Sequence, residues 1–408
     1  MNPAPYLLLL ALCPVGAGLS PAQDEPVNYD EAKVPTYDLP DPLVMEDGTR
    51  VETPEQWYKD RRPELVRLFE EHVYGRTPIQ SLKIRAVVMN ECMAFAGRVV
   101  RREIDLIVPG KPDGPIRLLI YSPVEAKGPS PAFLALNFMG NHSIQPDPEI
   151  KLSTQWIRDR AGHGIEKNRA TEASRGKLSS RWPVEQILAR GYAVVTAYYG
   201  DIDPDFDDGF ANGVHPALGS MSGAERKPNE WGSIGAWAWG LSRALDFLEG
   251  DALLDAGRVA LLGHSRLGKT ALWAGATDKR FALVISNNSG CGGAALSRRR
   301  FGETVARINH IFPHWFCERF RSYNGRESDL PVDQHQLIAL IAPRPVLICS
   351  AEEDHWADPQ GELLAARAAA PVFRFLKATP PVHRLRAGKH DVTTEDWTAY
   401  MDFADREL

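Results

Sequence analysis

The sequence has no dense stripe of lysine and arginine and no acidic tail, and its formal net charge at pH 7 is only −6. This charge pattern argues against nucleic acid or an anionic membrane surface as a partner. A run of three arginines, Arg298, Arg299 and Arg300, is short, and we expect it to be solvated. No apolar segment after Leu12 is long enough to cross a bilayer, so no membrane span is predicted.

The first residues differ in kind from the rest of the chain. Residues 6–12 are a compact apolar run, and small residues follow it up to Ala22. A run this short is typical of a signal peptide rather than of a membrane span, although the segment before it lacks lysine and arginine. We therefore expect residues 1–22 to be a signal peptide and the protein to be secreted or periplasmic.

Cysteine is scarce, with five residues in the whole chain, and Cys13 lies in the predicted signal peptide. The remaining four allow two disulfides in a secreted protein, and buried free thiols are an equal alternative. They are Cys92, Cys291, Cys317 and Cys349. No pair has metal-ligand spacing, and Pro313 interrupts any helix that would carry His310 and His314 on one face. We expect neither a metal nor another cofactor.

Two regions with different strand patterns follow an extended arm and a helix around residues 55–73. In the first region, alternation at 101–108 predicts a half-exposed antiparallel strand that belongs to a hairpin. In the second, short apolar strands alternate with helices, which predicts a mainly parallel sheet with helices on both faces. No repeat or linker interrupts residues 23–408, so one domain is expected. The expected strands are 82–89, 99–108, 116–121, 131–138, 192–198, 259–262, 283–286 and 345–350, and the expected helices include 183–190 and 231–248.

Two long insertions, 140–182 and 288–335, interrupt this alternation of strands and helices. In a doubly wound sheet such loops gather at the carboxyl ends of the strands, where ligands bind. We therefore expect long loops around a site at that edge.

The segment 259–272 carries the strongest functional signal. A short apolar strand ends in a tight turn with Ser265 at its tip, and a helical pattern begins directly after it. The nucleophilic serine of the α/β-hydrolase fold has this context, and the next N–H, here that of Arg266, helps to stabilise an oxyanion. Glycine usually stands two residues after the serine, whereas here Leu267 holds that place and Gly268 follows. The alternative is an ordinary turn with a capping serine.

A serine nucleophile needs a base, and in this fold the chain order is serine, acid, histidine. Only His383 and His390 follow the last predicted core strand. His390 lies in a glycine-containing turn rather than in a strand-like run, so we predict that it is the base. The acid should follow the strand 345–350 and orient the imidazole. Asp354 has the best position there, and Asp358 and Glu353 remain alternatives.

With these residues in view, the chain resembles the bacterial glucuronoyl esterases of carbohydrate esterase family 15 over residues 55–400. The resemblance rests on the serine segment, in which the family's glycine also lies three residues after the serine, and on segments 289–294, 333–335, 342–345 and 356–359. Family members cleave the ester between 4-O-methyl-glucuronic acid of xylan and lignin alcohols. The resemblance implies the α/β-hydrolase fold, a glucuronoxylan or lignin–carbohydrate ester as substrate, and an acyl-enzyme on Ser265.

The resemblance also implies roles for residues around the serine. Arg266 would hold the oxyanion through its backbone and side chain, and Lys269 would contact sugar hydroxyls. Glu303 and Trp356 would shape the sugar pocket. The alternatives are a solvated helix residue for Lys269 and plain packing for Trp356.

Two positions depart from patterns in the family. Many members place the catalytic glutamate immediately before the segment 289–293, where this chain has Asn288. Because asparagine supplies no negative charge, the acid must come from the loop after the later strand, which favours Asp354. The fungal type has a cysteine directly before the nucleophile, where this chain has His264, so that disulfide is absent.

Two other functions remain open. An esterase for acetyl-xylan or small alkyl esters would use the same serine, acid and histidine, and only Lys269, Glu303 and Trp356 would distinguish it. A catalytically silent carbohydrate-binding protein is favoured by Asn288 alone. The complete set of serine, acid and histidine opposes that second alternative.

Overall fold

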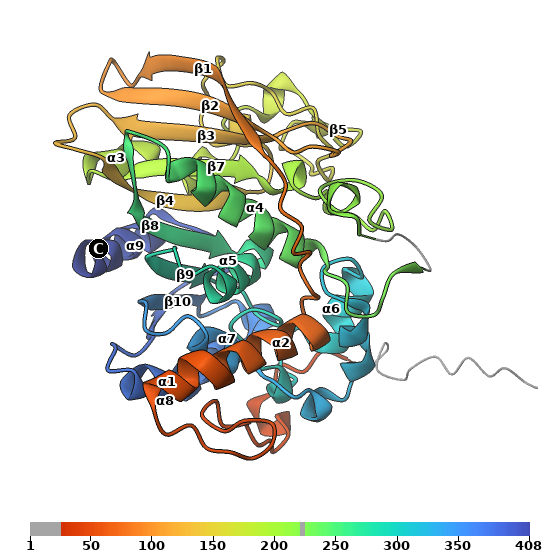
Figure 1. The fold of residues 1–408 in the computed structure, drawn as a ribbon. Coiled ribbons are helices and arrows are strands. Elements are labelled where there is room, and N and C mark those ends of the chain that lie inside the picture. Colours follow the sequence, from red (N-terminus) through yellow and green to blue (C-terminus); the bar gives the residue numbers. More distant parts are fainter. Residues whose placement is uncertain (1–25, 221–224) are drawn as a thin grey trace, which may run out of the picture.

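The computed structural model describes residues 26–220 and 225–408, and nine strands within these ranges form one sheet in the order β1-β2-β3-β7-β4-β8-β9-β10-β11. The strands from β7 to β11 in this order run parallel, and β1, β2 and β3 are antiparallel to their neighbours (Figure 1). The predicted mainly parallel sheet with antiparallel strands on its N-terminal side is confirmed. The strands are β1 (Arg85–Ala94), β2 (Val99–Ile107), β3 (Ile116–Pro123), β4 (Ser130–Asn137), β7 (Ala193–Tyr198), β8 (Leu254–His264), β9 (Leu283–Asn287), β10 (Val346–Ala351) and β11 (Val382–Arg386); β5 (Ile165–Glu166) and β6 (Arg169–Ala170) form a separate small hairpin.

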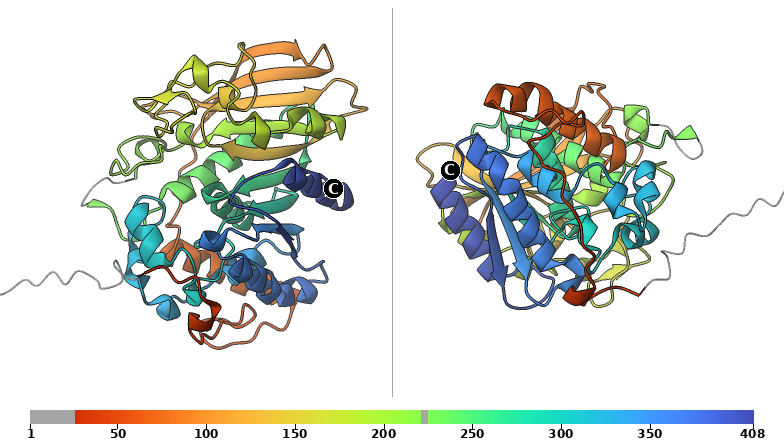
Figure 2. Two further views of the ribbon diagram at one scale, coloured as in Figure 1. Left: turned by 180° about the vertical axis from the view of Figure 1, so that it is seen from behind. Right: turned by 90° about the horizontal axis from the view of Figure 1, so that it is seen from below.

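Helices cover both faces of the sheet, as predicted. The face turned to the viewer in Figure 1 carries α4 and α5, and α7 packs against both α5 and α8. On the opposite face, seen from behind in Figure 2, α3 packs on β3 and β7, and α9 packs on β9 and β10. The expected helix at 55–73 is α1 (Pro54–Gln56), a π-helical turn (Trp57–Arg61) and α2 (Arg62–His72). The others are α3 (Val184–Ala189), α4 (Ser233–Leu248), α5 (Arg266–Thr277), α6 (Val305–Ile311), α7 (Gln334–Ala339), α8 (Pro359–Phe375) and α9 (Thr394–Glu407).

The central parallel strands are apolar because both of their faces are covered. Every residue of β7 is buried, as is nearly all of β4. On the α9 side, the ring of Trp397 lies edge-to-face on Phe133 of β4, with centroids 5.4 Å apart, and its indole N–H donates to the carbonyl of Arg181 at 2.8 Å. The last helix is thereby fixed onto the middle of the sheet.

The prediction of a half-exposed strand at 101–108 is wrong, because β2 is buried on both faces. Its charged side chains point into the structure and find partners there. Arg101 pairs with Asp147 of the insertion 140–182, and Arg102 forms a bidentate pair with Asp251 at 2.5 and 3.0 Å. Polar alternation in a sequence predicts solvent exposure only when no other segment covers the strand, and here two loops do.

The expectation that the three arginines are solvated is also wrong for two of them. Arg298 is buried and donates to the carbonyls of Leu330 and Val332 at 2.6 and 3.1 Å. Arg299 is buried between Asp358, at 2.8 Å, and Glu31 of the N-terminal arm, at 2.7 Å. Arg298 therefore joins two parts of the second insertion, and Arg299 joins the arm and this insertion to Asp358 in the body of the domain.

The predicted signal peptide, residues 1–22, lies outside the described residues. In the part of the chain that the structure describes, no helix has the length and apolar character of a membrane span. The four cysteines of this part have free thiols, so the free-thiol alternative holds for them: Cys92, Cys291, Cys317 and Cys349.

The Arg102–Asp251 pair makes the burial of β2 testable. We expect Arg102→Ala to lower the free energy of unfolding by about 3 kcal/mol, because it leaves the buried Asp251 carboxylate unpaired. The matched control is Arg98→Ala at the exposed Arg98–Glu185 pair, where we expect a loss below about 1 kcal/mol. Urea denaturation followed by circular dichroism measures both changes, and equal losses would contradict the buried pairing.

Candidate active site

The strands β8, β10 and β11 end at the same edge of the sheet, and predicted site residues follow their ends. Ser265 follows β8 directly, Asp354 lies three residues after β10, and His390 lies in the turn between β11 and α9. All seven residues predicted for the site line one cavity of about 330 Å³. They are Ser265, Arg266, Lys269, Glu303, Asp354, Trp356 and His390.

Ser265 lies in a turn that only particular glycines permit. Its backbone has φ 57° and ψ −129°, which is a strained conformation for a residue with a side chain. A Cβ on Gly263 would lie 1.9 Å from the carbonyl oxygen of Leu267, and one on Gly268 would lie 2.9 Å from the Cβ of Ser289. Glycine therefore stands at 268 because α5 packs there against the segment after β9.

The N-terminus of α5 supplies hydrogen-bond donors beside the serine. Ser265 is the N-cap of this helix, and Arg266 is its first residue. The first N–H groups of an α-helix have no intrahelical acceptor and carry partial positive charge. The Arg266 N–H is therefore available to a negatively charged oxygen near Ser265.

The imidazole of His390 contacts the carboxylate of Asp354, with 2.5 Å between Nδ1 and Oδ2. Asp354 is buried, whereas the His390 side chain is 40% exposed. Of the other two carboxylates left open by the sequence, Asp358 pairs with Arg299 and caps α8, and Glu353 is exposed. Asp354 is thus the carboxylate that reaches the histidine.

The turn that carries His390 is fixed by Arg386, which sequence analysis missed. This buried guanidinium donates to the carbonyls of Ala387 and Lys389, both at 2.9 Å, and to that of Asp391 at 2.8 Å. Its Nε also pairs with Asp396 of α9 at 2.8 Å. Arg386 lies at the end of a strand-like run, and no sequence pattern distinguishes it from a surface arginine.

The two positions that depart from the resemblance both lie beside the serine. Asn288 is buried in the left-handed region, at φ 48°, which asparagine tolerates better than most residues, and it lines the cavity. The ring of His264 lies 4.6 Å from that of His390. Burial and the neighbouring His390 hold the pKa of His264 well below its ordinary value, so this ring is a neutral wall of the site.

The ammonium group of Lys269 is buried, so the alternative of a solvated helix residue does not hold. Its Nζ donates to the carbonyls of Ser289 and Cys291 at 2.5 and 2.6 Å and lies 3.4 Å from Oε2 of Glu303. Burial raises the pKa of Glu303, and the charge of Lys269 opposes this shift. The backbone N–H of Glu303 donates to the carbonyl of Trp356 at 2.9 Å, which joins three walls of the cavity.

Sequence analysis also missed Glu362 of α8, whose carboxyl group binds the backbone of the segment after β9. Its Oε1 accepts the N–H groups of Ser289 and Gly290 at 2.7 and 3.0 Å, and its Oε2 accepts the hydroxyl of Ser350 at 2.5 Å. Burial raises the pKa of this carboxyl to about 7. Its position in an alanine-rich helix gives no signal of this role.

A second cavity, of about 320 Å³, meets the first at Ser265, Arg266 and His390. Besides Arg266, its walls combine apolar and aromatic side chains with three further arginines. They include Phe138, Met139, Ile157, Tyr199, Arg158, Arg160 and Arg181. The nucleophile candidate therefore stands between two chambers rather than at the end of one.

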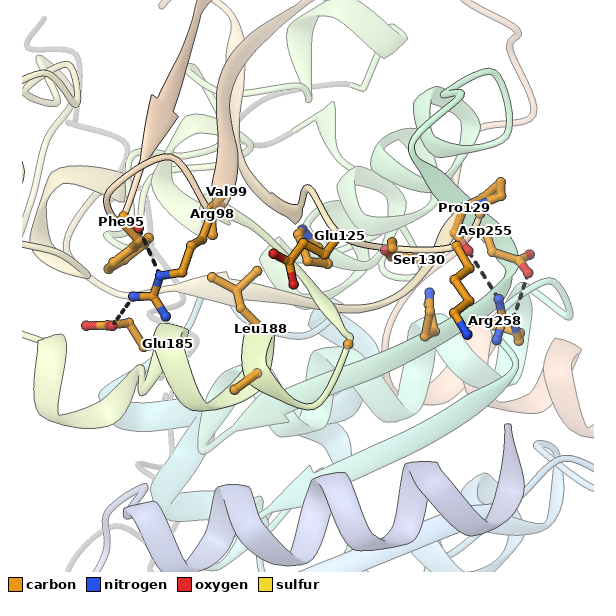
Figure 3. A pocket seen from close by; sticks show the side chains of 17 residues that line it. Phe95, Arg98, Val99, Glu125, Pro129, Ser130, Glu185, Leu188, Asp255 and Arg258 are labelled. Carbon is orange, nitrogen blue, oxygen red and sulfur yellow. Dashed lines mark hydrogen bonds and ion pairs between the residues drawn. The ribbon is translucent and has the colours of Figure 1, made fainter.

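The larger hollow of about 680 Å³ shown in Figure 3 lies elsewhere. It is lined by residues at the amino ends of β4 and β8, which is the edge of the sheet opposite to Ser265. Its arginines are paired with carboxylates, Arg98 with Glu185 and Arg258 with Asp255. It therefore takes no part in the site.

The site and the sheet together define the class of protein. A serine at a strand–helix turn, followed along the chain by an aspartate and a histidine that contact each other at the same edge, is the arrangement of an α/β-hydrolase with a serine nucleophile. The family model "Glucuronyl esterase, fungi" matches residues 226–377.

Similarity to known proteins extends over nearly the whole chain. Carbohydrate esterase MZ0003, from an unknown prokaryotic organism, is 51% identical over 95% of this chain and 93% of that protein. The structure of a promiscuous esterase of carbohydrate esterase family 15, from a marine bacterial metagenome, superposes with a TM-score of 0.87 at 50% identity and covers 94% of this chain and 100% of that one. The structure of the glucuronoyl esterase from Solibacter usitatus superposes with a TM-score of 0.86 at 43% identity, and the match covers 92% of this chain and 100% of that one. The chain belongs to carbohydrate esterase family 15, the glucuronoyl esterases, and is an esterase with the α/β-hydrolase fold.

The pKa of Glu362 gives the site a measurable pH dependence of stability. This carboxyl has a pKa of about 7 in the folded protein and an ordinary value of 4.5, so the folded state keeps a proton that the unfolded state loses. Its contribution to stability is complete below pH 4.5 and disappears as the pH rises through 7.

We expect the free energy of unfolding of wild type, relative to Glu362→Gln, to fall by on the order of 3 kcal/mol between pH 4.5 and 8. Glutamine keeps the shape and cannot ionise. Denaturant titrations at several pH values measure the difference, and Glu352→Gln at an exposed position directly after β10 is the control. A difference that does not change with pH would contradict the account of Glu362.

Proposed function

We propose that the protein hydrolyses the ester between glucuronic or 4-O-methyl-glucuronic acid and an alcohol, through an acyl-enzyme on Ser265. One observation carries this proposal. The seven site residues line one cavity, and within it Nδ1 of His390 lies 2.5 Å from Oδ2 of Asp354. The choice of a glucuronoyl substrate is supported by the glucuronoyl esterase from Solibacter usitatus, which matches over its full length. It is also supported by a fungal 4-O-methyl-glucuronoyl methylesterase from Wolfiporia cocos that is 36% identical over 38% of this chain and 40% of that protein.

In this mechanism the side chains divide the work of one acyl transfer. Asp354 holds Nδ1 of His390, which leaves Nε2 to take the proton from the Ser265 hydroxyl as its oxygen attacks the ester carbonyl. The Arg266 N–H and guanidinium stabilise the oxyanion. The alcohol leaves with the proton from His390. A water molecule then attacks the acyl-enzyme while His390 takes its proton, and His390 returns this proton to the Ser265 oxygen as the acid is released.

The two cavities fit the two sides of the ester. The first, with Lys269, Glu303 and Trp356, takes the sugar acid, because its polar groups are buried and fixed, as recognition of hydroxyl groups requires. The second takes the alcohol, and its aromatic and apolar walls suit a lignin alcohol. The natural substrate in this proposal is a glucuronoxylan ester, and residues 1–22 direct the single domain 23–408 out of the cytoplasm.

A broader ester specificity is the second candidate function. It is favoured by the description of the marine relative, 50% identical to this chain, as promiscuous. Acetyl-xylan or small alkyl esters would react at the same serine. They would make little use of Lys269, Glu303 and Trp356, so a comparison of substrates separates the two candidates.

The test is hydrolysis of benzyl glucuronate and of a plain acetyl ester by wild type, Ser265→Ala and Asp354→Asn. We expect wild type to prefer the glucuronate, Ser265→Ala to lose at least about 10⁴-fold in kcat, and Asp354→Asn to lose roughly 10³- to 10⁴-fold. Glu353→Gln is the matched control, because its carboxylate is exposed and adjacent to Asp354. We expect it to retain wild-type kcat.

Each other outcome has a definite meaning. Cleavage of the acetyl ester alone would support the broader specificity and contradict the glucuronoyl substrate. No cleavage of either ester by folded wild type would contradict the esterase mechanism. Equal losses in Glu353→Gln and Asp354→Asn would contradict the role given to Asp354.

A further inference from the structure

The guanidinium of Arg266 lies at the junction of the two cavities and is surrounded by aromatic rings. It lies 4.6 Å from the ring centroid of Trp315 and 5.3 Å from that of Phe312, and these two rings stack on each other at 3.7 Å. Its side chain is 22% exposed. A long side chain stabilises charge in a transition state only when its position is set beforehand, because reorientation during the reaction has a cost in free energy.

The position of Arg266 is set by Asp205, a fully buried carboxylate in the loop after β7. One oxygen, Oδ2, contacts Nη1 of Arg266 and accepts the hydroxyl of Tyr199 at 2.8 Å. The other, Oδ1, accepts the indole N–H of Trp315 at 2.7 Å and lies 3.0 Å from Nε2 of His314. Both oxygens of the carboxylate therefore have two partners each, which leaves this group one orientation.

Asp205 fixes the cation and its aromatic wall together. Trp315 lies against the guanidinium of Arg266 and also donates to the same carboxylate that pairs with it. Burial opposes the ionisation of Asp205, but the charge of Arg266 and the hydrogen bonds from His314 and Trp315 outweigh it and hold the pKa of Asp205 well below its usual range. Asp205 is thus ionised at neutral pH.

We infer that Asp205 is a positioning residue for ester cleavage, which fixes the guanidinium of Arg266 where it meets the negative charge that develops next to Ser265. This inference rests on the proposed function, in which Arg266 stabilises the oxyanion. Asp205 lines neither cavity, so it acts on the reaction through Arg266 and not through contact with substrate. Its removal should therefore affect the chemical step and not the affinity for the ester.

The test is Asp205→Asn, assayed with benzyl glucuronate. We expect kcat to fall roughly 10- to 100-fold while KM changes less than about threefold, because the guanidinium stabilises the transition state more than the bound ester. A double-mutant cycle supplies the second readout. In an Arg266→Ala background, we expect Asp205→Asn to lower kcat by less than about threefold, because the two residues act as one unit.

Asp251→Asn is the matched control, because it also removes the charge of a buried aspartate paired with an arginine. This aspartate lies between α4 and β8, at the edge of the sheet opposite to Ser265, and its partner is Arg102 of β2. We expect this variant to lower stability and leave kcat unchanged. Tyr199→Phe tests the same carboxylate with less risk to folding. It keeps the ring that lines the second cavity and removes only the hydroxyl that donates to Oδ2 of Asp205. We expect it to lower kcat severalfold with KM unchanged, and this result decides the question if Asp205→Asn does not fold.

An unchanged kcat in folded Asp205→Asn, or in Tyr199→Phe where Asp205→Asn does not fold, would overturn the inference. So would losses from Asp205→Asn and Arg266→Ala that simply add. In both cases, activity in wild type and its loss in Ser265→Ala would leave the proposed function intact. An inactive wild type would overturn both.

Discussion

The close approach of Gly263 to the carbonyl of Leu267 is the constraint on which the site depends. A side chain at 263 would occupy the same space as that carbonyl, so the strand–helix turn closes only with glycine there. The tight turn holds Ser265 in its strained backbone conformation and starts α5 directly behind it. The nucleophile and the donors at the helix N-terminus therefore come from one local constraint, and the rest of the fold brings partners to it.

Those partners are held in place by buried ionisable groups that lie outside the cavity, as well as by the cavity walls. Arg386 fixes the turn of His390, Glu362 fixes the segment after β9, and Asp205 contacts Arg266. Each of the three contacts at least three polar partners, and these contacts fix the orientation of its side chain. The same feature makes the site sensitive to changes well outside the cavity.

Residues with a fixed order along the chain could be predicted from the sequence. The strand–turn–helix around Ser265 is local. The chain order of acid and histidine after it favoured His390 as the base and Asp354 as the acid, with Asp358 and Glu353 left as alternatives, and the structure places the side chains of Asp354 and His390 in contact. The parallel strands could also be predicted from the sequence, because a short apolar run between two helical segments is compatible with few structures other than a buried strand. Arg386 and Asp205 carry no such pattern, since their partners are set by loops far away in the sequence.

The two wrong predictions have the same physical origin. Charged residues in β2 and in the run around Arg299 were expected to be exposed, but segments distant in sequence cover them and supply carboxylates or carbonyls. A single sequence shows the charge of a side chain, but it does not show which distant segment covers that side chain in the folded protein. Burial of paired charges is therefore the part of this fold that only the tertiary structure reveals.

The most direct test of the central claim is covalent labelling of Ser265 in the folded protein. An organophosphate ester such as diethyl 4-nitrophenyl phosphate transfers its diethylphosphoryl group to an activated serine and releases 4-nitrophenol, and mass spectrometry locates the adduct. The account predicts one adduct, on Ser265, that forms more slowly when glucuronate occupies the cavity. An adduct on another residue, or no adduct on the folded protein, would contradict it.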